Sequence, residues 1–306
     1  MRFKPKNFVV LHLNWKLNIM QRPFICTKPR KNHLPVIYNS PHSGRIYDGN
    51  FLRQSALSFK EIRISEDFYV DTLLDSVVDY GAFLLEASFP RSFVDVNRAA
   101  SDLDQNLILD LDVKSMNPKT AAGLGVIPRI VGDGIEIYPQ KLNLKEVNRR
   151  LDIYYFPYHN QLQKLINQAI DNFGVAILFD IHSMPHSCLE SLDSAVSEPP
   201  QIVLGDCFGT SCDPWFSQAV FDVFDSEGFV VRKNCPFSGG FITKNYGVSE
   251  QNVQVIQIEI DRSLYMDEVN FTLKSGFFDL KKKLQKIFDL LSDIGGKKGL
   301  LLQAAE

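Results

Sequence analysis

Short apolar runs alternate with longer amphipathic stretches along most of the chain, a pattern that predicts strands alternating with helices. The apolar runs predict strands over 35–40, 82–87, 175–179, 201–204, 229–232 and 253–260. The unbroken run at 175–179 is typical of a central strand that is buried on both faces of a sheet. Because side chains alternate along a strand, we expect Gln257 and Glu259 to share one face of the last strand while Ile258 points the other way.

Apolar residues at helical spacing predict helices over 65–80, 144–173, 214–227 and 271–291, with a shorter helix inside 51–64. Ser65 is the expected N-cap of the helix over 65–80, and Asp67 and Asp71 at i, i+4 spacing would share one of its faces. We expect Pro157 to kink or split the helix over 144–173. The remaining segments predict loops over 99–120 and 187–200, a loop and hairpin over 123–138, a flexible glycine-rich loop over 236–247 and a frayed tail over 295–306.

The composition is that of one large globular domain. The chain has 306 residues, of which 45% are apolar and 23% charged, and we assign residues 26–306 to a single α/β domain with a mixed sheet covered by helices on both faces. The net charge of −3 gives no case for binding nucleic acid or an anionic membrane, and no apolar run approaches the roughly 18 residues of a membrane span. The five cysteines lack metal-type spacing, so we expect reduced thiols and a cytoplasmic location.

The first 25 residues form a basic extension that we expect to lie outside the domain. No acidic residue occurs before Asp48, whereas lysine and arginine are frequent. The apolar part of this extension is interrupted by His12, Asn14 and Lys16, which makes it a poor secretory signal. An organellar transit peptide and a true start at Met20 both stay open as explanations.

Polar groups follow two of the predicted strands, at the edge where open α/β sheets place their ligands. We interpret His182, at the end of the central strand, as a metal ligand, with Asp180 as a neighbour that could orient it. His42 follows the strand at 35–40 in a Pro-His-Ser-Gly turn that could present its ring to the same cleft. For both histidines, a structural role at a strand end or a surface turn is the alternative. Glu259 lies near the end of an otherwise apolar strand, where an acid is costly to bury unless it is paired or functional.

Several side chains suit the binding of an anion. Arg91, Asn97 and Arg98 follow the strand at 82–87, and two guanidinium groups with an amide can bind a carboxylate. A structural ion pair with a nearby acid is the alternative for these arginines. Arg129, in the glycine-rich segment, is a further candidate for binding an anionic substrate. His159 is either packed among aromatic residues in the core or a contact to substrate.

Eight segments carry a resemblance to a known family. They are SPHSG (40–44), EDFYVDTLLD (66–75), PRSFVDVNR (90–98), GLGVIPRIVGDGIEIY (123–138), PYHNQL (157–162), DIHSMP (180–185), GGFITKNYG (239–247) and QIEIDRSLYMDE (257–268). In this order, over roughly residues 36–268, they resemble the N-formylglutamate amidohydrolase family. That family is similar in fold to the zinc carboxypeptidases and aspartoacylases. The resemblance therefore implies a three-layer αβα sandwich with a mixed central sheet and a zinc-activated water.

The resemblance also implies roles for individual residues. His42, His182 and one acid of the 66–71 segment would bind one zinc ion, because two imidazoles and a carboxylate with an open position form a catalytic zinc arrangement. We choose Asp67 as that acid. Whether Glu66, Asp67 or Asp71 is the ligand stays open at this point. Glu259 corresponds to the acid expected to act as general base. The expected substrate contacts are Arg91, Asn97, Arg98, Arg129 and His159.

The implied activity is the zinc-dependent hydrolysis of N-formylglutamate to formate and glutamate, so the expected partner is a small-molecule N-acyl amino acid. Two alternatives stay open. One is a related hydrolase acting on another N-acyl amino acid or a peptide-like amide, and the other is a non-catalytic member that binds an acidic ligand. The sequence pattern predicts no particular oligomeric state.

Overall fold

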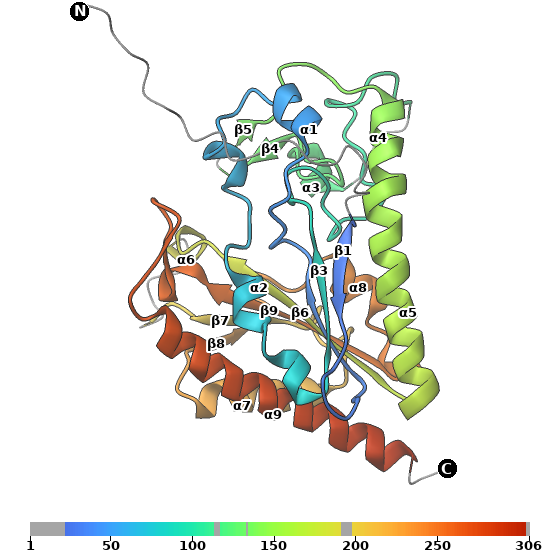
Figure 1. The fold of residues 1–306 in the computed structure, drawn as a ribbon, viewed down its shortest axis with the longest axis vertical. Helices are drawn as coiled ribbons and strands as arrows, with labels where there is room; N and C mark the ends of the chain where they lie inside the picture. Colours follow the sequence, from blue (N-terminus) through green and yellow to red (C-terminus); the bar gives the residue numbers. More distant parts are fainter. Residues whose placement is uncertain (1–21, 113–116, 133, 191–197, 304–306) are drawn as a thin grey trace, which may run out of the picture.

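The computed structural model describes residues 22–112, 117–132, 134–190 and 198–303, and its centre is a seven-stranded sheet in the order β1-β3-β2-β6-β9-β7-β8 (Figure 1). The strands are β1 Phe24–Thr27, β2 Val36–Ser40, β3 Phe83–Ala87, β6 Ala176–Met184, β7 Ile202–Gly205, β8 Val231–Lys233 and β9 Val253–Asp261. Strands β3, β2, β6 and β9 are parallel neighbours, whereas β1 and β7 run antiparallel to β3 and β9. The mixed sheet expected from the sequence is confirmed.

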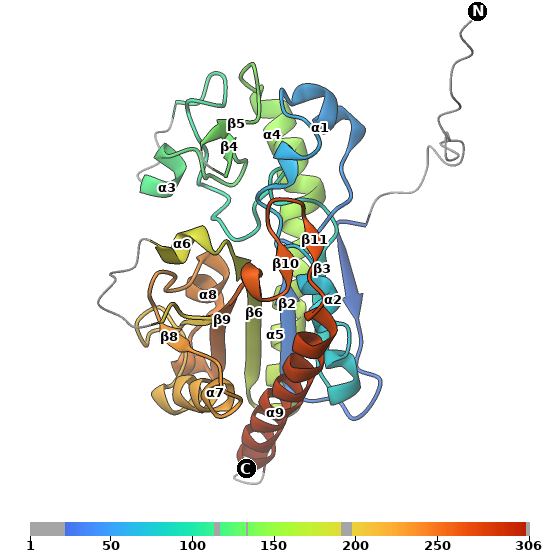
Figure 2. The same cartoon turned by 90° about the vertical axis from the view of Figure 1, so that its left-hand side faces the viewer.

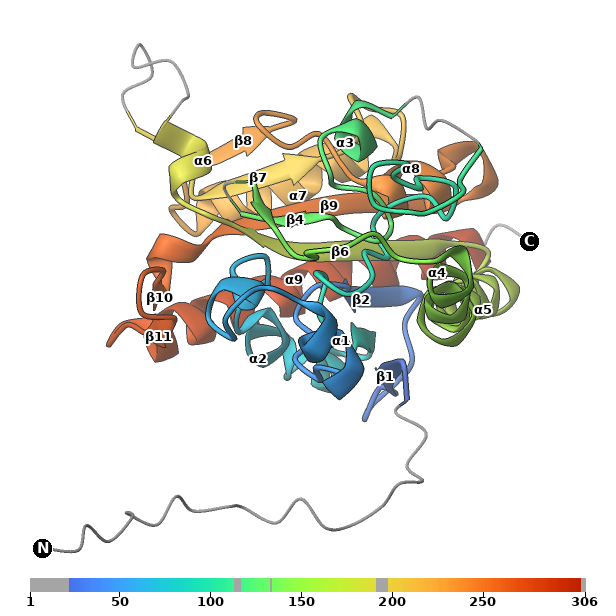
Figure 3. The same ribbon diagram turned by 90° about the horizontal axis from the view of Figure 1, so that it is seen from above.

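Helices cover both faces of this sheet, so the chain forms a three-layer αβα sandwich. The covering helices include α5 Phe156–Phe173 on one face and α2 Val70–Leu74, α7 Pro214–Ser226 and α9 Phe277–Gln303 on the other. Alternate residues of β6 belong to different layers, because Leu178 packs in the cluster with α5 and Phe179 packs in the cluster with α7 and α9. Seen from above, β7, β9, β6 and β2 lie side by side (Figure 3).

The central strand is longer than its apolar run. We predicted a strand over 175–179, but β6 continues through Asp180 and His182 to Met184, and all its residues are buried. The reason is that β9 continues alongside it, so that Asp180 pairs with Gln257, His182 with Glu259 and Met184 with Asp261. These polar side chains are therefore fixed by a regular ladder of backbone hydrogen bonds rather than by a loop.

The predicted start of the helix over 65–80 is wrong. Helix α2 begins only at Val70, after Tyr69 takes a left-handed conformation with φ 62°, and the 3₁₀ turn η2 Val77–Tyr80 follows. The Tyr69 hydroxyl donates to the Phe271 carbonyl at 3.0 Å, a contact that anchors this conformation. Ser65 therefore caps no helix, and Asp67 lies before α2 instead of sharing a helical face with Asp71.

The helical stretch predicted over 144–173 is confirmed, with its irregular turn ahead of Pro157. It consists of α4 Leu144–Arg150, a π-helical turn η3 Leu151–Tyr155 and α5. Proline has no N–H to donate to the preceding turn, so the backbone widens before it and Pro157 then occupies the first turn of α5.

The segments after β2 and β3 gather over the carboxyl end of the parallel strands (Figure 2). They form α1 Gly49–Gln54, η1 Glu61–Arg63, α3 Pro118–Ala121 and the hairpin β4 Ile130–Val131 with β5 Ile135–Glu136, the hairpin being confirmed. The remaining elements are α6 Ser187–Glu190, α8 Phe241–Tyr246, η4 Ser249–Gln251, η5 Arg262–Leu264 and the hairpin β10 Met266–Asp267 with β11 Thr272–Leu273.

Three loop or tail predictions need correction. Helix α8 occupies half of the segment predicted as a flexible loop, because the backbone at its start bonds to buried polar side chains of the sheet and of the 90–98 segment. Helix α6 lies at the start of the predicted loop 187–200, of which residues 191–197 lie outside the described part. Helix α9 runs to Gln303 through the predicted tail, because Gly295 and Gly296 lie against Val36 and Leu34.

The basic extension overlaps the sheet by two residues, since β1 begins at Phe24, while residues 1–21 lie outside the described part. In the described ranges, every helix is too short or too polar to cross a membrane.

Gly44 is expected to be needed for the turn that carries His42. A Cβ atom on Gly44 would overlap the Phe89 carbonyl oxygen and lie 2.6 Å from the Ser88 carbonyl carbon, both of which are backbone atoms. Gly44→Ala should therefore lower the free energy of unfolding by about 1–3 kcal/mol in urea denaturation. Gly49→Ala is the control because its Cβ would meet only the end of Arg53 at 3.4 Å. Equal stability of the two variants would contradict this account.

Candidate active site

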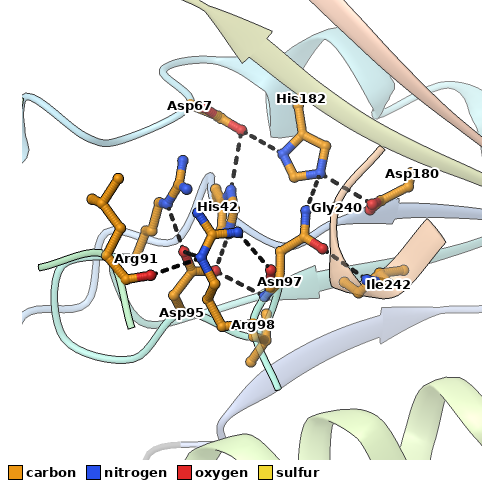
Figure 4. Close-up of polar contacts among 12 residues, drawn as sticks. His42, Asp67, Arg91, Asp95, Asn97, Arg98, Asp180, His182, Gly240 and Ile242 are labelled. Carbon is orange, nitrogen blue, oxygen red and sulfur yellow. Dashed lines mark hydrogen bonds and ion pairs between the residues drawn. The ribbon is translucent and has the colours of Figure 1, made fainter. Parts of the chain in front are cut away.

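Three side chains from distant parts of the chain meet at the carboxyl end of the sheet (Figure 4). His42 follows β2, Asp67 precedes α2 and His182 lies in β6. One ligand atom of each lies within 4.8 Å of the other two, and all three residues are buried. Two imidazoles and a carboxylate in this arrangement could hold a metal ion.

Each imidazole has one ring nitrogen against a carboxylate and the other directed toward Asp67. His42 Nε2 lies 2.8 Å from Asp95 Oδ1, and His182 Nε2 lies 3.1 Å from Asp180 Oδ2. The other nitrogen, Nδ1, lies 3.6 Å from Asp67 Oδ2 in His42 and 3.0 Å from the same oxygen in His182. With an N–H on each Nε2 directed to its carboxylate, Nδ1 is the nitrogen that each ring can offer to a metal ion beside Asp67.

The surroundings of His42 Nδ1 indicate whether His42, Asp67 and His182 fit a metal ion. It is buried and has no hydrogen-bond partner among the described residues, although leaving a buried polar atom unsatisfied costs about 1–3 kcal/mol. Metal-bound histidines characteristically donate their other ring N–H to a carboxylate, as both histidines do here. The residues therefore fit a zinc ion, for which nitrogen and oxygen ligands are usual.

Buried hydrogen bonds hold Asp180 behind His182. Asn39 Nδ2 donates to Asp180 Oδ1 at 2.7 Å, and the Tyr158 hydroxyl donates to Asn39 Oδ1 at 2.5 Å. All three of these residues are fully buried, so water cannot replace the contacts. The orientation of the His182 ring thus depends on a chain of contacts that reaches α5.

Asp95 contacts Nε2 of His42 in the same way that Asp180 contacts Nε2 of His182. It accepts from Arg91 Nε at 2.9 Å and from the Asn97 backbone N–H at 2.8 Å. Although burial opposes ionisation, the charges of Arg91 and His42 hold the pKa of Asp95 well below its usual range. Asp95 is therefore an anion that fixes the N–H of His42.

Asp67 is held from a second direction by Arg262, whose Nη2 donates to Asp67 Oδ1 at 3.1 Å. Burial opposes its charge, but the hydrogen bond from His182 and the neighbouring imidazole of His42 keep the pKa of Asp67 well below the ordinary value. Burial likewise opposes a charged His182, yet Asp180 and Asp67 raise its pKa well above the usual range. The site is thus already built to place a positive charge between these carboxylates.

The neighbouring acids left open by the sequence have other partners. Glu66 accepts from the Tyr47 hydroxyl at 2.6 Å and from Arg63 Nε at 2.9 Å. Asp71 pairs with Arg45. Of Glu66, Asp67 and Asp71, it is Asp67 that lies with the two histidines.

Glu259 lies beside His182, on strand β9 next to β6. It is paired in register with His182, and it accepts from Gln257 Nε2 at 2.8 Å. The expected alternation of β9 is confirmed, because Gln257 and Glu259 line the same cavity whereas Ile258 packs in the cluster on the opposite face. Burial raises the pKa of Glu259 to about 7. This carboxyl group is therefore close to half-protonated near neutral pH.

A cavity of about 300 Å³ joins the histidines to Glu259, and we call it the inner cavity. It is lined by His42, Arg91, Asn97, Arg98, Lys119, His182, Pro236, Phe237, Ser238, Gly239, Gly240, Gln257 and Glu259. Its volume is at the lower end for small-molecule sites, and its lining includes the carboxyl group of Glu259 and the cations of Arg91, Arg98 and Lys119.

Comparison with known proteins agrees with the resemblance in the sequence. The model of the N-formylglutamate amidohydrolase family matches residues 34–266, well over half of the chain. The chain belongs to this family. It is 27% identical over 266 residues to an N-formylglutamate deformylase of Pseudomonas putida, a match covering 85% of this chain and 92% of that protein. It is 28% identical to the enzyme of the same name from Pseudomonas aeruginosa, over 78% of this chain and 85% of that one.

Two solved structures have the same fold as this chain. The crystal structure of an N-formylglutamate amidohydrolase from Ralstonia eutropha matches with a TM-score of 0.84 and 32% identity, over 90% of this chain and 98% of that one. A gene product of Agrobacterium tumefaciens matches with a TM-score of 0.62 and 16% identity, over 90% and 97% of the two chains, which shows a common fold.

Arg129 does not line the inner cavity. Its Nε donates to Asp104 at 2.9 Å and its Nη1 donates to Glu136 at 2.9 Å, so both contacts lie within the segments above the sheet. These two acids hold its guanidinium group, and Arg129 is not among the residues that line the inner cavity, so its role as a substrate contact stays a prediction.

His159 likewise lies outside the lining of the inner cavity and packs among aromatic rings, which was one of its two expected roles, while the other role, as a substrate contact, stays a prediction. Its Nε2–H donates to the Val96 carbonyl at 3.0 Å, and its Nδ1 accepts from the Tyr246 hydroxyl at 2.8 Å. It thus joins α5 to α8 and to the segment that carries Asn97. Burial lowers the pKa of His159 to about 4, so the ring is neutral at neutral pH.

Helix α8 in turn fixes two of the cavity residues. The Gly240 N–H donates to Gln257 Oε1 at 2.7 Å, and the Ile242 N–H donates to Asn97 Oδ1 at 2.8 Å. Asn97 Nδ2 then lies 3.2 Å from His182 Nε2. A side chain at Gly240 would overlap the Asn97 amide, so this close approach requires glycine.

Sequence reasoning gave no functional role to Asp95, Gln257, Arg262 or Lys119. An ion pair with a nearby acid was the alternative for Arg91, and Asp95 is the acid that pairs with it. Gln257 could have been found from its alternation with Glu259, since both point to one face of β9. Arg262 lies in one of the segments that carry the resemblance, but no local pattern around Arg262 or Lys119 indicates a role, because their relation to the site depends on contacts distant in sequence.

We expect His159 to make stability depend on pH. Its pKa is about 4 in the folded protein and about 6.5 when unfolded, so between these values the unfolded chain binds more protons and stability falls as pH falls. From pH 7 to pH 5 this loss amounts to about 2 kcal/mol. His159→Gln, compared with the unmodified protein in urea denaturation at both pH values, should show a correspondingly smaller loss. Parallel losses in the two proteins would contradict the assignment.

Proposed function

We propose that this protein hydrolyses the formyl amide of N-formylglutamate to formate and glutamate, with one zinc ion bound by His42, Asp67 and His182. The observation that carries the proposal is that Glu259 lines the same cavity as the two histidines of the metal cluster. Membership of the family and the names of the Pseudomonas relatives support the choice of substrate.

Zinc held by these three residues would polarise the formyl carbonyl and lower the pKa of the attacking water. Asp95 and Asp180 keep the two imidazoles in the tautomer whose Nδ1 is available as a ligand. Arg262 offsets part of the charge of Asp67, so the ligand set carries less negative charge than the carboxylate alone would give it.

Glu259 is the proposed general base. It removes a proton from the attacking water and delivers that proton to the amine nitrogen as the carbon–nitrogen bond breaks. A carboxyl group whose pKa burial raises to about 7 can both accept and release a proton near neutral pH. The hydrogen bond from Gln257 fixes one oxygen of Glu259 and leaves the other to act.

Arg91 and Arg98 are the proposed anchors for the α-carboxylate of the substrate. Within the described part of the chain, Arg91 uses only Nε for Asp95, and its two terminal nitrogens remain for a ligand. Arg98 is fixed through Nε to the Leu124 carbonyl and through Nη1 to the Asn97 carbonyl, which leaves Nη2. Each charge-assisted hydrogen bond of this kind is worth about 1.5–3 kcal/mol.

We also propose a reducing, cytoplasmic location. The support is that Cys26, Cys207, Cys212 and Cys235 are free thiols in the structure. Free thiols are usual in that compartment and uncommon in secreted proteins.

The metal proposal predicts about one zinc per chain by elemental analysis of protein purified without chelators. His182→Ala should lose the metal, and Asp180→Asn should weaken zinc affinity by about 10–100-fold in competition with a chromophoric chelator. His186→Ala is the control, because this partly exposed histidine pairs with Asp261 outside the cluster. Protein that binds no zinc, and gains no deformylase activity when zinc is added, would instead support a non-catalytic member of the family.

The general-base proposal predicts that Glu259→Gln lowers kcat for N-formylglutamate by about 10²–10⁴-fold with zinc content unchanged. Released formate, measured with formate dehydrogenase, gives the rate. Glu250→Gln, the same change at an exposed position of η4, should leave the rate unaltered. Near-normal kcat in Glu259→Gln would remove Glu259 from the mechanism.

A further inference from the structure

A second cavity adjoins the inner cavity, and we call it the outer cavity. Its volume is about 530 Å³, and its lining consists of Asn97, Arg98, Ala99, Asp102, Asn117, Lys119, Gly239, Gly240, Phe241, Lys244 and Asn245. The two cavities share Asn97, Arg98, Lys119, Gly239 and Gly240. A ligand bound in the inner cavity can therefore extend past these residues into the outer one.

The outer cavity is rich in positive charge. Arg98, Lys119 and Lys244 line it, against the single carboxylate of Asp102. Asp102 Oδ2 already accepts from the Asn117 amide at 3.0 Å and from the Ala99 backbone N–H at 3.2 Å. The cavity thus offers an excess of cations to an incoming anion.

Lys119 is the cation at the junction of the two cavities. Its ammonium group makes no side-chain hydrogen bond or ion pair with any residue in the described ranges, whereas its backbone N–H donates to the Asn117 cap of α3. Lys119 is exposed at the mouth of the cavity, yet partial desolvation by surrounding atoms and the charges of Arg98 and Arg91 lower its pKa. An anion placed among these three cations would relieve their mutual repulsion.

We propose that Lys119, with Lys244 farther out, binds the side-chain carboxylate of the substrate and makes the protein select N-acyl amino acids with an anionic side chain. This inference rests on the proposed function and assigns the second anion of the substrate. Arg91 and Arg98 lie on the inner cavity with Glu259, so they hold the α-carboxylate next to the scissile amide. The side chain then extends toward Lys119, where the inner cavity opens into the outer one.

The test compares N-formylglutamate with N-formylglutamine, which has nearly the same shape but an uncharged side chain. The unmodified protein should favour N-formylglutamate in kcat/KM. Lys119→Met keeps most of the aliphatic length without the charge, and it should lower the ratio of the two kcat/KM values by at least about tenfold. Lys244→Met should lower the ratio less, because Lys244 lines only the outer cavity.

Two further variants separate charge from structure. Lys119→Arg keeps the positive charge and should retain a clear preference for N-formylglutamate. Lys145→Met removes an exposed lysine from α4, away from both cavities, and should leave the ratio unchanged. Added salt should reduce the preference of the unmodified protein more than that of Lys119→Met, because salt screens charge pairs.

A ratio in Lys119→Met within about twofold of the unmodified value would overturn the inference, as would an equal loss on both substrates. In either case deformylation itself would persist in the unmodified protein, so the proposed function would stand. If the zinc-loaded protein cleaved neither substrate, the proposed function would fail, and the inference would fail with it.

Discussion

The buried carboxylate of Asp67 is the group on which the rest of the site depends. It is only 1% exposed, and it is contacted by His42 after β2, by His182 in β6 and by Arg262 after β9. A carboxylate removed from water is strongly destabilising unless its charge is compensated, so these contacts also hold together the carboxyl ends of three neighbouring strands. The arrangement that can bind a metal is therefore part of what stabilises this edge of the sheet.

Charged side chains surround the two imidazoles in a definite order. Asp95 and Asp180 lie behind the imidazoles and fix one nitrogen of each, while Arg91 and Arg98 line the inner cavity in front. In the proposed function, a substrate with carboxylates meets these cations at the cavity wall, and its amide faces the imidazoles and Glu259. The proposed orientation of the substrate follows from this order of charges, and buried hydrogen bonds keep the charged side chains in place.

Much of the fold could be predicted from local pattern. Six of the seven strands of the central sheet and the long helical stretch over 144–173 follow from apolar spacing, whereas β1 was not predicted. The alternation of β9 places Glu259 on the face that lines the inner cavity. The helix start near Ser65 was wrong because Tyr69 adopts a left-handed conformation that a contact with Phe271 anchors, and no local pattern reveals that contact.

By itself, the sequence determined the α/β class, the mixed sheet and the short set of residues able to do chemistry, because hydrophobic period and residue type are local properties. Only the tertiary structure decided which of these residues meet. Asp67 pairs with Arg262 across 195 positions, whereas Arg129, equally suited by type, is held by Asp104 and Glu136. The free energy of a charge in the interior depends on the groups that surround it, and chain topology alone brings those groups together.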